Sequence, residues 1–215
     1  FKNKSFGVTE FLAKKLGVLG KETMLIYNKN LSVSPVTTHI KIKTVDINRT
    51  FNNYIYGYKK RLINLGSETY MLDKIVFNED SIIIDCGANI GELYLYFKYI
   101  RSIKPANYFA YEPSPIEFDA LSFNVHNCNN IFRKALSNKI TTLDFKLIPE
   151  TADSHIIDGD ENYEESGVLK VDTVTLNEEI KRLKLNNMRI KLLKLEAEGA
   201  ELNVLEGCLE FLKNI

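Results

Sequence analysis

The chain has 215 residues, of which 45% are hydrophobic and 26% are charged, and its 28 basic and 28 acidic residues give a formal net charge of zero. This composition excludes a disordered chain, and without a basic excess or a block of like charges it also argues against a nucleic-acid partner. The length suits one domain with an extension.

Residues 1–66 are expected to form a mixed α/β extension in front of the main domain. Apolar residues at helical spacing in 8–16 predict a short amphipathic helix, and alternating Ile and Lys residues in 39–47 predict a strand with one exposed face. Ser67 and Glu68 occupy cap-like positions that predict a helix directly after them. The extension is expected to cover an acceptor pocket or to contact a second subunit in a homo-oligomer.

From residue 78 onward, apolar runs of strand length alternate with helical patterns. We expect strands in "SIIID", "YFAYEP", "NIFRKAL", "LDFKLI", "VLKVDTV" and "RIKLLKLE", with helices between most of them and Thr175 as the N-cap of the helix before the last strand. This alternation predicts an α/β fold with a doubly wound, mostly parallel sheet. Residues 67–215 are therefore expected to form the main domain, with its ligand at the carboxyl ends of the strands.

The motif "DCGANIG" joins the first of these strands to the first helix. Gly87 can adopt a positive φ and lets a ligand approach the backbone, Gly91 lets the helix pack close to the strand, and Asn89 tolerates the left-handed region. Asp85 disfavours a diphosphate and favours a ligand that carries an ammonium and a sulfonium, as S-adenosylmethionine does. The alternative is that Asp85 only caps the following helix.

The second strand ends in "YEPSP". Glu112 follows the glycine turn by about 20 to 30 residues, where a carboxylate accepts hydrogen bonds from both hydroxyls of a ribose. Pro113 fixes the direction of the chain directly after it. A solvated strand end is the alternative for Glu112, but the preceding glycine turn favours adenosine binding.

Charged residues follow one face of the last predicted strand, "LLKLE". Lys194, Glu196 and Glu198 share this face, whereas a buried parallel strand is apolar on both faces, so the pattern predicts a cleft. Glu196 is our candidate for orienting an acceptor hydroxyl or taking its proton, with Lys194 as its partner. The alternative is a structural ion pair at the strand end. Glu201 is expected to complement the N-terminus of the next helix.

Five segments resemble, in order and wording, the FkbM family of S-adenosylmethionine-dependent methyltransferases: "IIIDCGANIGELYLYF", "YEPSPIEFDALSFNV", "ALSN", "ADSHII" and "LLKLEAEGAELNVLEG". The resemblance covers roughly residues 70 to 215 and implies a class I methyltransferase Rossmann-like sheet. It also implies O-methylation, often of sugar or other hydroxyl acceptors. By position, it implies contacts to the methionine half of the cofactor from Asp85, Gly87, Ala88, Asn89 and Gly91, to the ribose from Glu112 and Pro113, and beside the adenine from Ala135 and Ser137.

Other residues in the similar region bear on the acceptor. In "ADSHII", Asp153 and Ser154 are candidates for substrate binding, and Glu198 is a third. His155 stands where the family usually has a second serine, and a histidine near the methyl group can act as a base at neutral pH. Asn124 matches a recurrent asparagine of the family, with a helix-surface role as the alternative. Related domains continue with at least one more strand, so this domain is expected to be C-terminally incomplete.

We therefore expect a methyltransferase that uses S-adenosylmethionine to O-methylate a sugar, glycan or small metabolite. The sulfonium is an activated donor, so the protein mainly aligns the acceptor oxygen. One alternative is an NAD(P)-dependent oxidoreductase, which shares the strand, turn and acidic contact but conflicts with Asp85 and Asn89. A second is a binding module that keeps the fold without activity.

The cysteines and the apolar runs bear on localisation. Cys86, Cys128 and Cys208 lie far apart and form no C-x-x-C pair, which is typical of reduced thiols and not of a disulfide framework or a zinc site. The sequence has no apolar run near the roughly 20 residues of a transmembrane helix, and its N-terminus lacks the order of a signal peptide. We expect a cytoplasmic protein without a membrane span or a bound metal.

Overall fold

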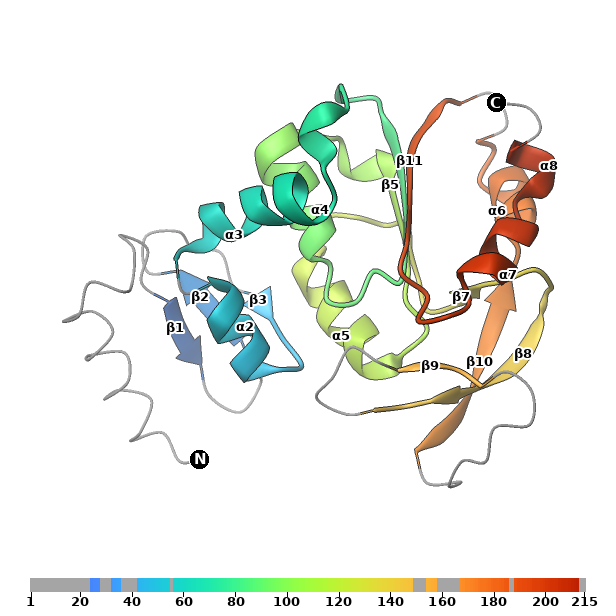
Figure 1. The fold of residues 1–215 in the computed structure, drawn as a ribbon, viewed down its shortest axis with the longest axis horizontal. Helices are drawn as coiled ribbons and strands as arrows, with labels where there is room; N and C mark the ends of the chain where they lie inside the picture. The colour runs from blue at the N-terminus through green and yellow to red at the C-terminus, as the bar shows by residue number, and fades with distance from the viewer. Residues whose placement is uncertain are drawn as a thin grey trace.

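The computed structural model describes residues 24–27, 32–35, 42–54, 56–148, 154–157, 167–185 and 188–212. Its centre is a parallel four-stranded sheet in the order β11-β4-β5-β6 (Figure 1). The strands are β4 (Ile82–Cys86), β5 (Tyr108–Tyr111), β6 (Ile131–Phe132) and β11 (Ile190–Leu195). The helix expected within residues 8–16 lies outside the described residues.

Helices cover both faces of this sheet (Figure 1). One layer contains α4 (Glu92–Tyr96), the π-helical turn η3 (Phe97–Arg101) and α5 (Pro115–Asn124), and a short 3-10 turn, η4 (Pro105–Asn107), precedes β5. The opposite layer contains α6 (Leu176–Arg182), α7 (Glu201–Glu206) and α8 (Leu209–Leu212). Thr175 accepts a hydrogen bond from the Glu178 backbone N–H, which confirms it as the N-cap of α6. The predicted α/β fold with a parallel sheet is confirmed.

Strand β4 lies at the centre of the core because all five of its residues are buried. Side chains alternate along a strand, so Ile83 enters the core beneath α4 and α5, whereas Ile82 and Ile84 enter the core beneath α6 and α7. An apolar residue at nearly every position is what a parallel strand with two covered faces requires. Its one acidic residue, Asp85, is therefore conspicuous.

A second four-stranded sheet follows the order β7-β10-β8-β9. Its strands are β7 (Ala135–Leu136), β8 (Thr141–Lys146), β9 (His155–Ile156) and β10 (Val168–Val174). Only β7 runs parallel to β10, while the β10–β8 and β8–β9 pairs are antiparallel.

The second sheet corrects two predictions. "NIFRKAL" is not one strand: it divides into β6, in the central sheet, and β7, in the second sheet. "VLKVDTV" is a strand, but it lies outside the central parallel sheet. The reason is visible in its burial pattern, because exposed Lys170 and Asp172 alternate with buried Val171 and Thr173, as in a strand with one solvated face.

The N-terminal segment forms an antiparallel sheet of β1 (Met24–Tyr27), β2 (Ser32–Pro35) and β3 (Ile42–Lys43), followed by α2 (Ile47–Tyr54) and α3 (Tyr58–Asn64). The predicted helix start at Ser67 and Glu68 is wrong. Both residues lie in a π-helical turn that continues α3, η1 (Leu65–Thr69), and only a 3-10 turn, η2 (Leu72–Lys74), comes after them. Tyr54, Tyr58 and Leu62 share the core beneath α4 and α5.

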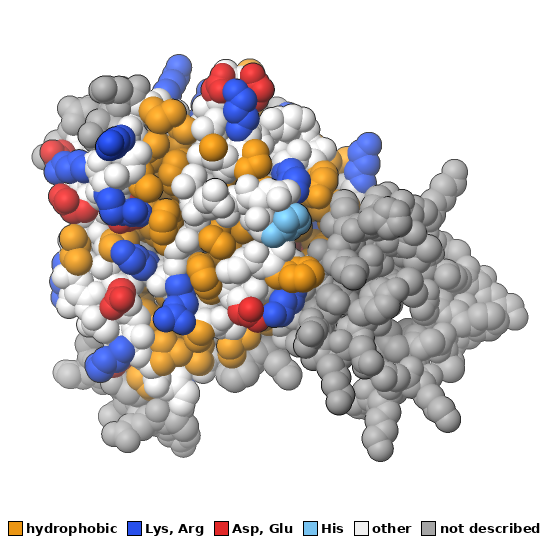
Figure 2. All heavy atoms as spheres, turned by 180° about the vertical axis from the view of Figure 1, so that it is seen from behind, with side chains coloured by type: hydrophobic (Ala, Val, Ile, Leu, Met, Phe, Trp, Pro, Cys, Tyr) orange, Lys and Arg blue, Asp and Glu red, His pale blue; other side chains and the backbone are white. Residues whose placement is uncertain are grey.

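The burial of the cysteines and the character of the surface bear on the remaining expectations from the sequence. The three cysteines are buried and unpaired. On the coloured part of the rear face, basic and acidic side chains are scattered among hydrophobic ones (Figure 2). Within the described ranges, no helix has the length and apolar character needed to cross a bilayer.

Candidate functional site

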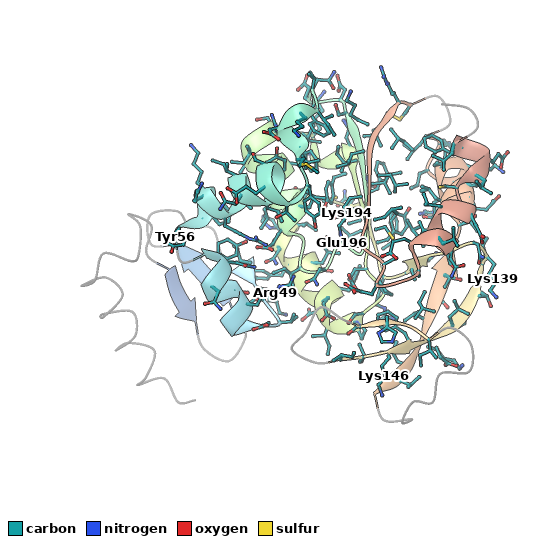
Figure 3. The ribbon with its side chains drawn as sticks, viewed as in Figure 1. Arg49, Tyr56, Lys139, Lys146, Lys194 and Glu196 are labelled. Atoms are coloured by element: carbon teal, nitrogen blue, oxygen red, sulfur yellow. The ribbon has the colours of Figure 1, made fainter. Side chains whose placement is uncertain are left out.

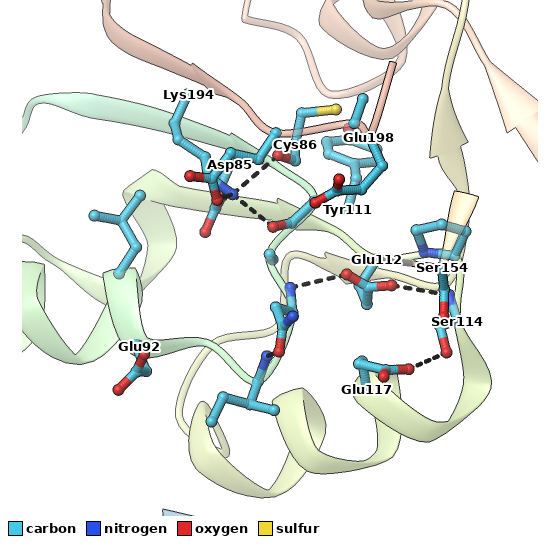
Figure 4. A pocket seen from close by; sticks show the side chains of 18 of the residues that line it. Asp85, Cys86, Glu92, Tyr111, Glu112, Ser114, Glu117, Ser154, Lys194 and Glu198 are labelled. Carbon is cyan, nitrogen blue, oxygen red and sulfur yellow. Dashed lines mark hydrogen bonds and ion pairs between the residues drawn. The ribbon is translucent and has the colours of Figure 1, made fainter. Parts of the chain in front are cut away.

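A cavity of about 380 Å³ opens at the carboxyl ends of β4, β5 and β11 (Figure 4). This is where parallel α/β sheets bind ligands. Its walls come from the glycine turn after β4, from "YEPS" after β5, from residues 194–200, from the second sheet and from residues 44–70. Most of the predicted site residues line it: Asp85, Gly87, Ala88, Asn89, Glu112, Pro113, Ala135, Ser154, Lys194, Glu196 and Glu198.

The glycine turn is shaped by contacts within the chain. Gly87 has φ 73°, and a Cβ at this position would lie 1.8 Å from the Glu196 backbone oxygen. Glycine is therefore required by the junction with β11, and this reason was missing from the sequence analysis. The N–H groups of Gly87 and Ala88 both donate to the Tyr111 carbonyl at 3.0 Å, which fixes the turn on β5.

Two further residues complete the turn. Asn89 adopts the left-handed conformation, with φ 49°, and its side-chain oxygen accepts a hydrogen bond from the Ile90 N–H at 2.8 Å. Gly91 does not line the cavity. A Cβ there would lie 2.9 Å from both Leu121 and Val125, so Gly91 allows a close approach to α5 and its neighbouring residues, not to the strand as we had predicted.

Glu112 is buried beside the turn. Its carboxylate accepts hydrogen bonds from the N–H groups of Asn89 at 2.8 Å and Ser114 at 2.9 Å (Figure 4). Burial raises the pKa of Glu112 to about 7, against the opposing effect of the two backbone donors. Ionised carboxylate oxygens have about four lone-pair sites, so Glu112 can accept further hydrogen bonds from a ligand. It is thus a strand-end acceptor and not a solvated acid.

Lys194 connects the acidic residues at the ends of β4 and β11. Its ammonium lies 3.1 Å from Asp85 and 3.0 Å from Glu196, which confirms the predicted pairing with Glu196, and it donates to the carbonyls of Cys86 and Gly87. Burial alone would lower the pKa of Lys194, but the charge of Asp85, with contributions from Tyr70 and Glu196, raises it above its ordinary value.

Asp85 is completely buried beneath the turn. It accepts a hydrogen bond from the Tyr108 hydroxyl and faces Lys194, so its charge is balanced within the protein. The N-cap of α4 is Gly91, whereas the hydrogen bond and ion pair of Asp85 go to Tyr108 and Lys194 and not to that helix. Asp85 therefore shapes the electrostatics of the cavity through Lys194.

Glu196 stands at the more open side of this network, with 51% of its side chain exposed. The Tyr70 hydroxyl donates to its carboxylate, 2.9 Å from each oxygen. Burial, together with the charge of Glu196, raises the pKa of Tyr70 despite the opposing charge of Lys194. The exposed carboxylate is thus held from two sides and faces the cavity. Sequence reasoning missed Tyr70 because it lies outside every recognised motif.

The second sheet supplies an apolar wall made of Ala135, Leu136, Phe145 and Ile156. Ser154 lines the cavity too, and its hydroxyl accepts a hydrogen bond from the Ile148 N–H at 3.0 Å. This wall can pack against a flat ring such as a nucleobase.

Besides Gly91, two predicted residues that the structure describes, His155 and Ser137, do not line the cavity. His155 lies on β9 between Ser154 and Ile156, and because side chains alternate along a strand it faces away from the wall that they form. Ser137 is buried and donates its N–H to the Val174 carbonyl at 2.9 Å, outside the lining. Asp153 lies outside the described residues.

Glu201 binds the loop between β11 and α7. Its carboxylate accepts hydrogen bonds from the N–H groups of Ala197 at 2.8 Å and Gly199 at 3.1 Å. These backbone donors, that of Ala197 first, lower the pKa of Glu201. Glu201 thus fixes the loop that carries Glu198, in addition to standing at the start of α7.

Residues 44–70 form a wall of the cavity, and none of them was predicted from the sequence as a site residue. Arg61 donates to Glu92 through two nitrogens, at 3.1 and 2.6 Å, and both side chains line the cavity. Asp46 accepts a hydrogen bond from the Arg49 N–H at 2.9 Å at the start of α2. An aspartate before a helix is a recognisable start signal, but only the fold brings this helix to the cavity.

Comparisons with known proteins found one family model, two similar curated proteins and one similar solved structure. Residues 85–215 match the family model described as "Methyltransferase FkbM domain". "Methyltransferase 1" from Beauveria bassiana (strain ARSEF 2860) is 26% identical over 193 residues, which are 77% of this chain and 75% of that protein. "Methyltransferase sdnD" from Sordaria araneosa is 32% identical over 160 residues, which are 58% of this chain and 59% of that protein. The crystal structure of the FkbM methyltransferase from Methylobacillus flagellatus KT aligns with a TM-score of 0.42 and 12% identity over 67% of this chain and 33% of that chain.

Proposed function

Because the chain belongs to the FkbM methyltransferase family, we propose that it transfers the methyl group of S-adenosylmethionine to a hydroxyl oxygen of a sugar, glycan or small metabolite. One observation carries the proposal. A single cavity joins a glycine turn, a buried acid at the next strand end and a half-exposed acid, Glu196, at the end of the neighbouring strand β11. Binding and reacting groups thus share one space.

The residues present suit this cofactor. Glu112 retains acceptor capacity beside the turn, as ribose hydroxyls require, and the apolar wall of the second sheet suits an adenine ring. Gly87 and Ala88, which line the cavity, carry no bulky side chain of their own. An anionic cofactor such as NAD is disfavoured because acidic side chains outnumber basic ones in the lining.

When bound, the cofactor supplies a sulfonium methyl that is already electrophilic. The protein's contribution is therefore alignment of the acceptor oxygen. Lys194 and Tyr70 donate to Glu196, which leaves its carboxylate oriented and able to accept a hydrogen bond from an acceptor hydroxyl. In this position Glu196 can also take the proton that the hydroxyl loses.

Cofactor binding is tested by calorimetry with S-adenosylhomocysteine and, separately, with NADH. We expect the wild type to bind S-adenosylhomocysteine and not NADH. Glu112→Ala should weaken this binding about 10- to 100-fold, because hydrogen bonds to a charged acceptor are lost. Binding of NADH without S-adenosylhomocysteine would refute the proposal.

The role of Glu196 is tested with Glu196→Gln. We expect unchanged affinity for S-adenosylhomocysteine and a loss of methyl transfer of about 100-fold or more in a screen of sugars and small hydroxyl compounds. Glu178→Gln, on the exposed surface of α6, removes the same charge away from the cavity and should leave transfer unaltered. Equal turnover of wild type and Glu196→Gln would remove Glu196 from the mechanism.

A further inference from the structure

Resting on the proposed function, we propose that residues 44–70 form the acceptor wall of the cavity and select a hydroxyl-rich acceptor that carries an oxyanion, a carboxylate or a phosphate, bound by Arg49. The wall precedes the part of the chain that matches the family domain, which begins at residue 85. It contributes nine lining residues: Thr44, Val45, Asp46, Arg49, Thr50, Asn53, Arg61, Leu65 and Thr69, with Tyr70 as a tenth at its end.

Asn124 of α5 is one of the side chains that fix the wall to the cofactor side, because it binds Lys43 directly before the wall. Its amide oxygen accepts a hydrogen bond from the Lys43 N–H at 2.7 Å, and its amide nitrogen donates to the Lys43 carbonyl at 2.8 Å. The same nitrogen donates to the Ile90 carbonyl of the glycine turn at 2.7 Å. Asn124 is buried, so these bonds set the position of the wall relative to the turn. It is therefore not a helix-surface residue.

The wall is also ordered internally. The hydroxyls of Thr44 and Thr50 are hydrogen-bonded to each other, and both residues are buried. The Thr44 hydroxyl also donates to the Asp46 carbonyl at 3.0 Å. These contacts hold the start of α2 in place and leave Arg49 at the side of α2 that lines the cavity, between this helix and the sheet that carries Lys194 and Glu196 (Figure 3).

The cations of the lining differ in their partners. Arg61 is paired with Glu92, and Lys194 is paired with Asp85 and Glu196. Across the described ranges, no acidic side chain forms a hydrogen bond or ion pair with the Arg49 guanidinium, and the Asp46 carboxylate accepts only from the Arg49 backbone N–H. A guanidinium binds carboxylate and phosphate oxygens through two parallel hydrogen bonds. Arg49 is thus the cation that remains available to a ligand.

Neighbouring polar groups indicate a hydroxyl-rich molecule. Asn53 and Thr69 line the cavity, and within the described part of the chain their side chains make no hydrogen bond. An amide and a hydroxyl both donate and accept, as sugar hydroxyls do. An apolar acceptor would leave these groups desolvated without partners, at a cost that disfavours its binding.

Charge also fixes the orientation of the acceptor. Seven carboxylates line the cavity: Asp46, Asp85, Glu92, Glu112, Glu117, Glu196 and Glu198. An oxyanion placed near most of them would be repelled. If the oxyanion binds Arg49, the hydroxyls of the same molecule are directed toward the rest of the cavity, where Glu196 lies. The arrangement therefore discriminates against neutral acceptors as well as apolar ones.

The experiment uses wild type saturated with S-adenosylhomocysteine and titrates matched probes: glucose, galactose, their uronates and their 6-phosphates. We expect at least one uronate or phosphate to bind about 10- to 100-fold more tightly than its neutral sugar, because a charge-assisted pair replaces a neutral contact. Preference for the uronate or for the phosphate identifies the source of the oxyanion. Equal binding of charged and neutral probes, or binding of none, overturns the proposal.

Variants test whether Arg49 causes the preference for the charged probe. Arg49→Gln should abolish the preference for the charged probe without altering S-adenosylhomocysteine affinity, and Arg49→Lys should retain part of it. Lys139→Gln removes one positive charge from the exposed turn between β7 and β8, far from the cavity, and should change nothing (Figure 3). A charge preference that survives in Arg49→Gln refutes this assignment. Failure of the wild type to bind S-adenosylhomocysteine would instead refute the proposed function, and the acceptor wall with it.

Discussion

The two sides of the cavity differ in how their polar groups are used. On the cofactor side, Asp85 is balanced by Lys194 and Tyr108, and Glu112 by two backbone donors. On the acceptor wall, Arg49 and Asn53 line the cavity without such partners in the described part of the chain. The cofactor side is preorganised around buried groups, whereas the acceptor wall presents groups whose hydrogen bonds remain to be made. The cofactor side thus suits a ligand that is the same in every reaction, whereas the acceptor wall suits selection among different acceptors.

The largest effect is expected at the junction of β4 and β11. Gly87→Ala would place a Cβ 1.8 Å from the Glu196 backbone oxygen at a positive φ, so we expect a loss of unfolding free energy of about 4 kcal/mol in urea denaturation. Gly199→Ala is the matched control, because Gly199 has φ 97° with no heavy atom within 4 Å of its Cβ position. It should cost about 1 kcal/mol, the strain alone. Equal losses would show that the close approach at Gly87 is unimportant.

Glu112 gives the cofactor side a pH dependence. Burial raises its pKa from 4.5 to about 7, so between these values the folded protein keeps a proton that the unfolded chain has lost. Its contribution to stability is therefore complete below pH 4.5 and falls as the pH rises through 7, by about 3 kcal/mol in full.

Urea denaturation from pH 4 to 8 measures this effect as the difference between wild type and Glu112→Gln, whose side chain does not titrate. Relative to that variant, wild type should lose stability as the pH rises. Glu178→Gln, at an exposed position, should show no such difference. A flat difference for Glu112→Gln would mean that this carboxyl titrates normally in the folded protein.

Asn124 is one of the connections between the two sides. Asn124→Ala leaves the Lys43 and Ile90 backbone groups without their partner, and we expect a loss of about 2 kcal/mol. Hydrogen exchange should become faster in residues 42–54, and S-adenosylhomocysteine should bind more weakly. Ser122→Ala removes one local bond on the same helix and should cost less than about 0.5 kcal/mol. Unchanged exchange in residues 42–54 would show that the acceptor wall is held independently of Asn124.

The smallest effect on stability is expected at Tyr70. Tyr70→Phe removes the hydroxyl that donates to Glu196, at about 1 kcal/mol or less, and should leave S-adenosylhomocysteine affinity unchanged. Methyl transfer should fall about tenfold, because the carboxylate is held only by Lys194. Tyr56→Phe, on an exposed side chain, is the control. A change in cofactor affinity without a change in turnover would place Tyr70 on the cofactor side.

Most misplaced elements have a common cause. The strands and helices from residue 78 onward could be predicted because the spacing of apolar residues and the residues that cap helices are local signals. The second sheet was missed because periodicity identifies a strand and not its neighbours, although the alternation in β10 does distinguish a half-exposed strand. The helix expected after Ser67 failed because α3 continues through this position, where Gly66 packs against the Tyr96 ring.

The sequence by itself determined the features that depend only on residues close together in the chain. These are the apolar strand before "DCGANIG", the acid at the end of the next strand and the charged face of "LKLE". Only the tertiary structure decided which of these groups are neutralised and which face the cavity. Tyr70 and Glu196 are 126 positions apart, and Lys43 and Asn124 are 81 apart. Contacts over such separations depend on how layers pack, a property that no local pattern of residues encodes.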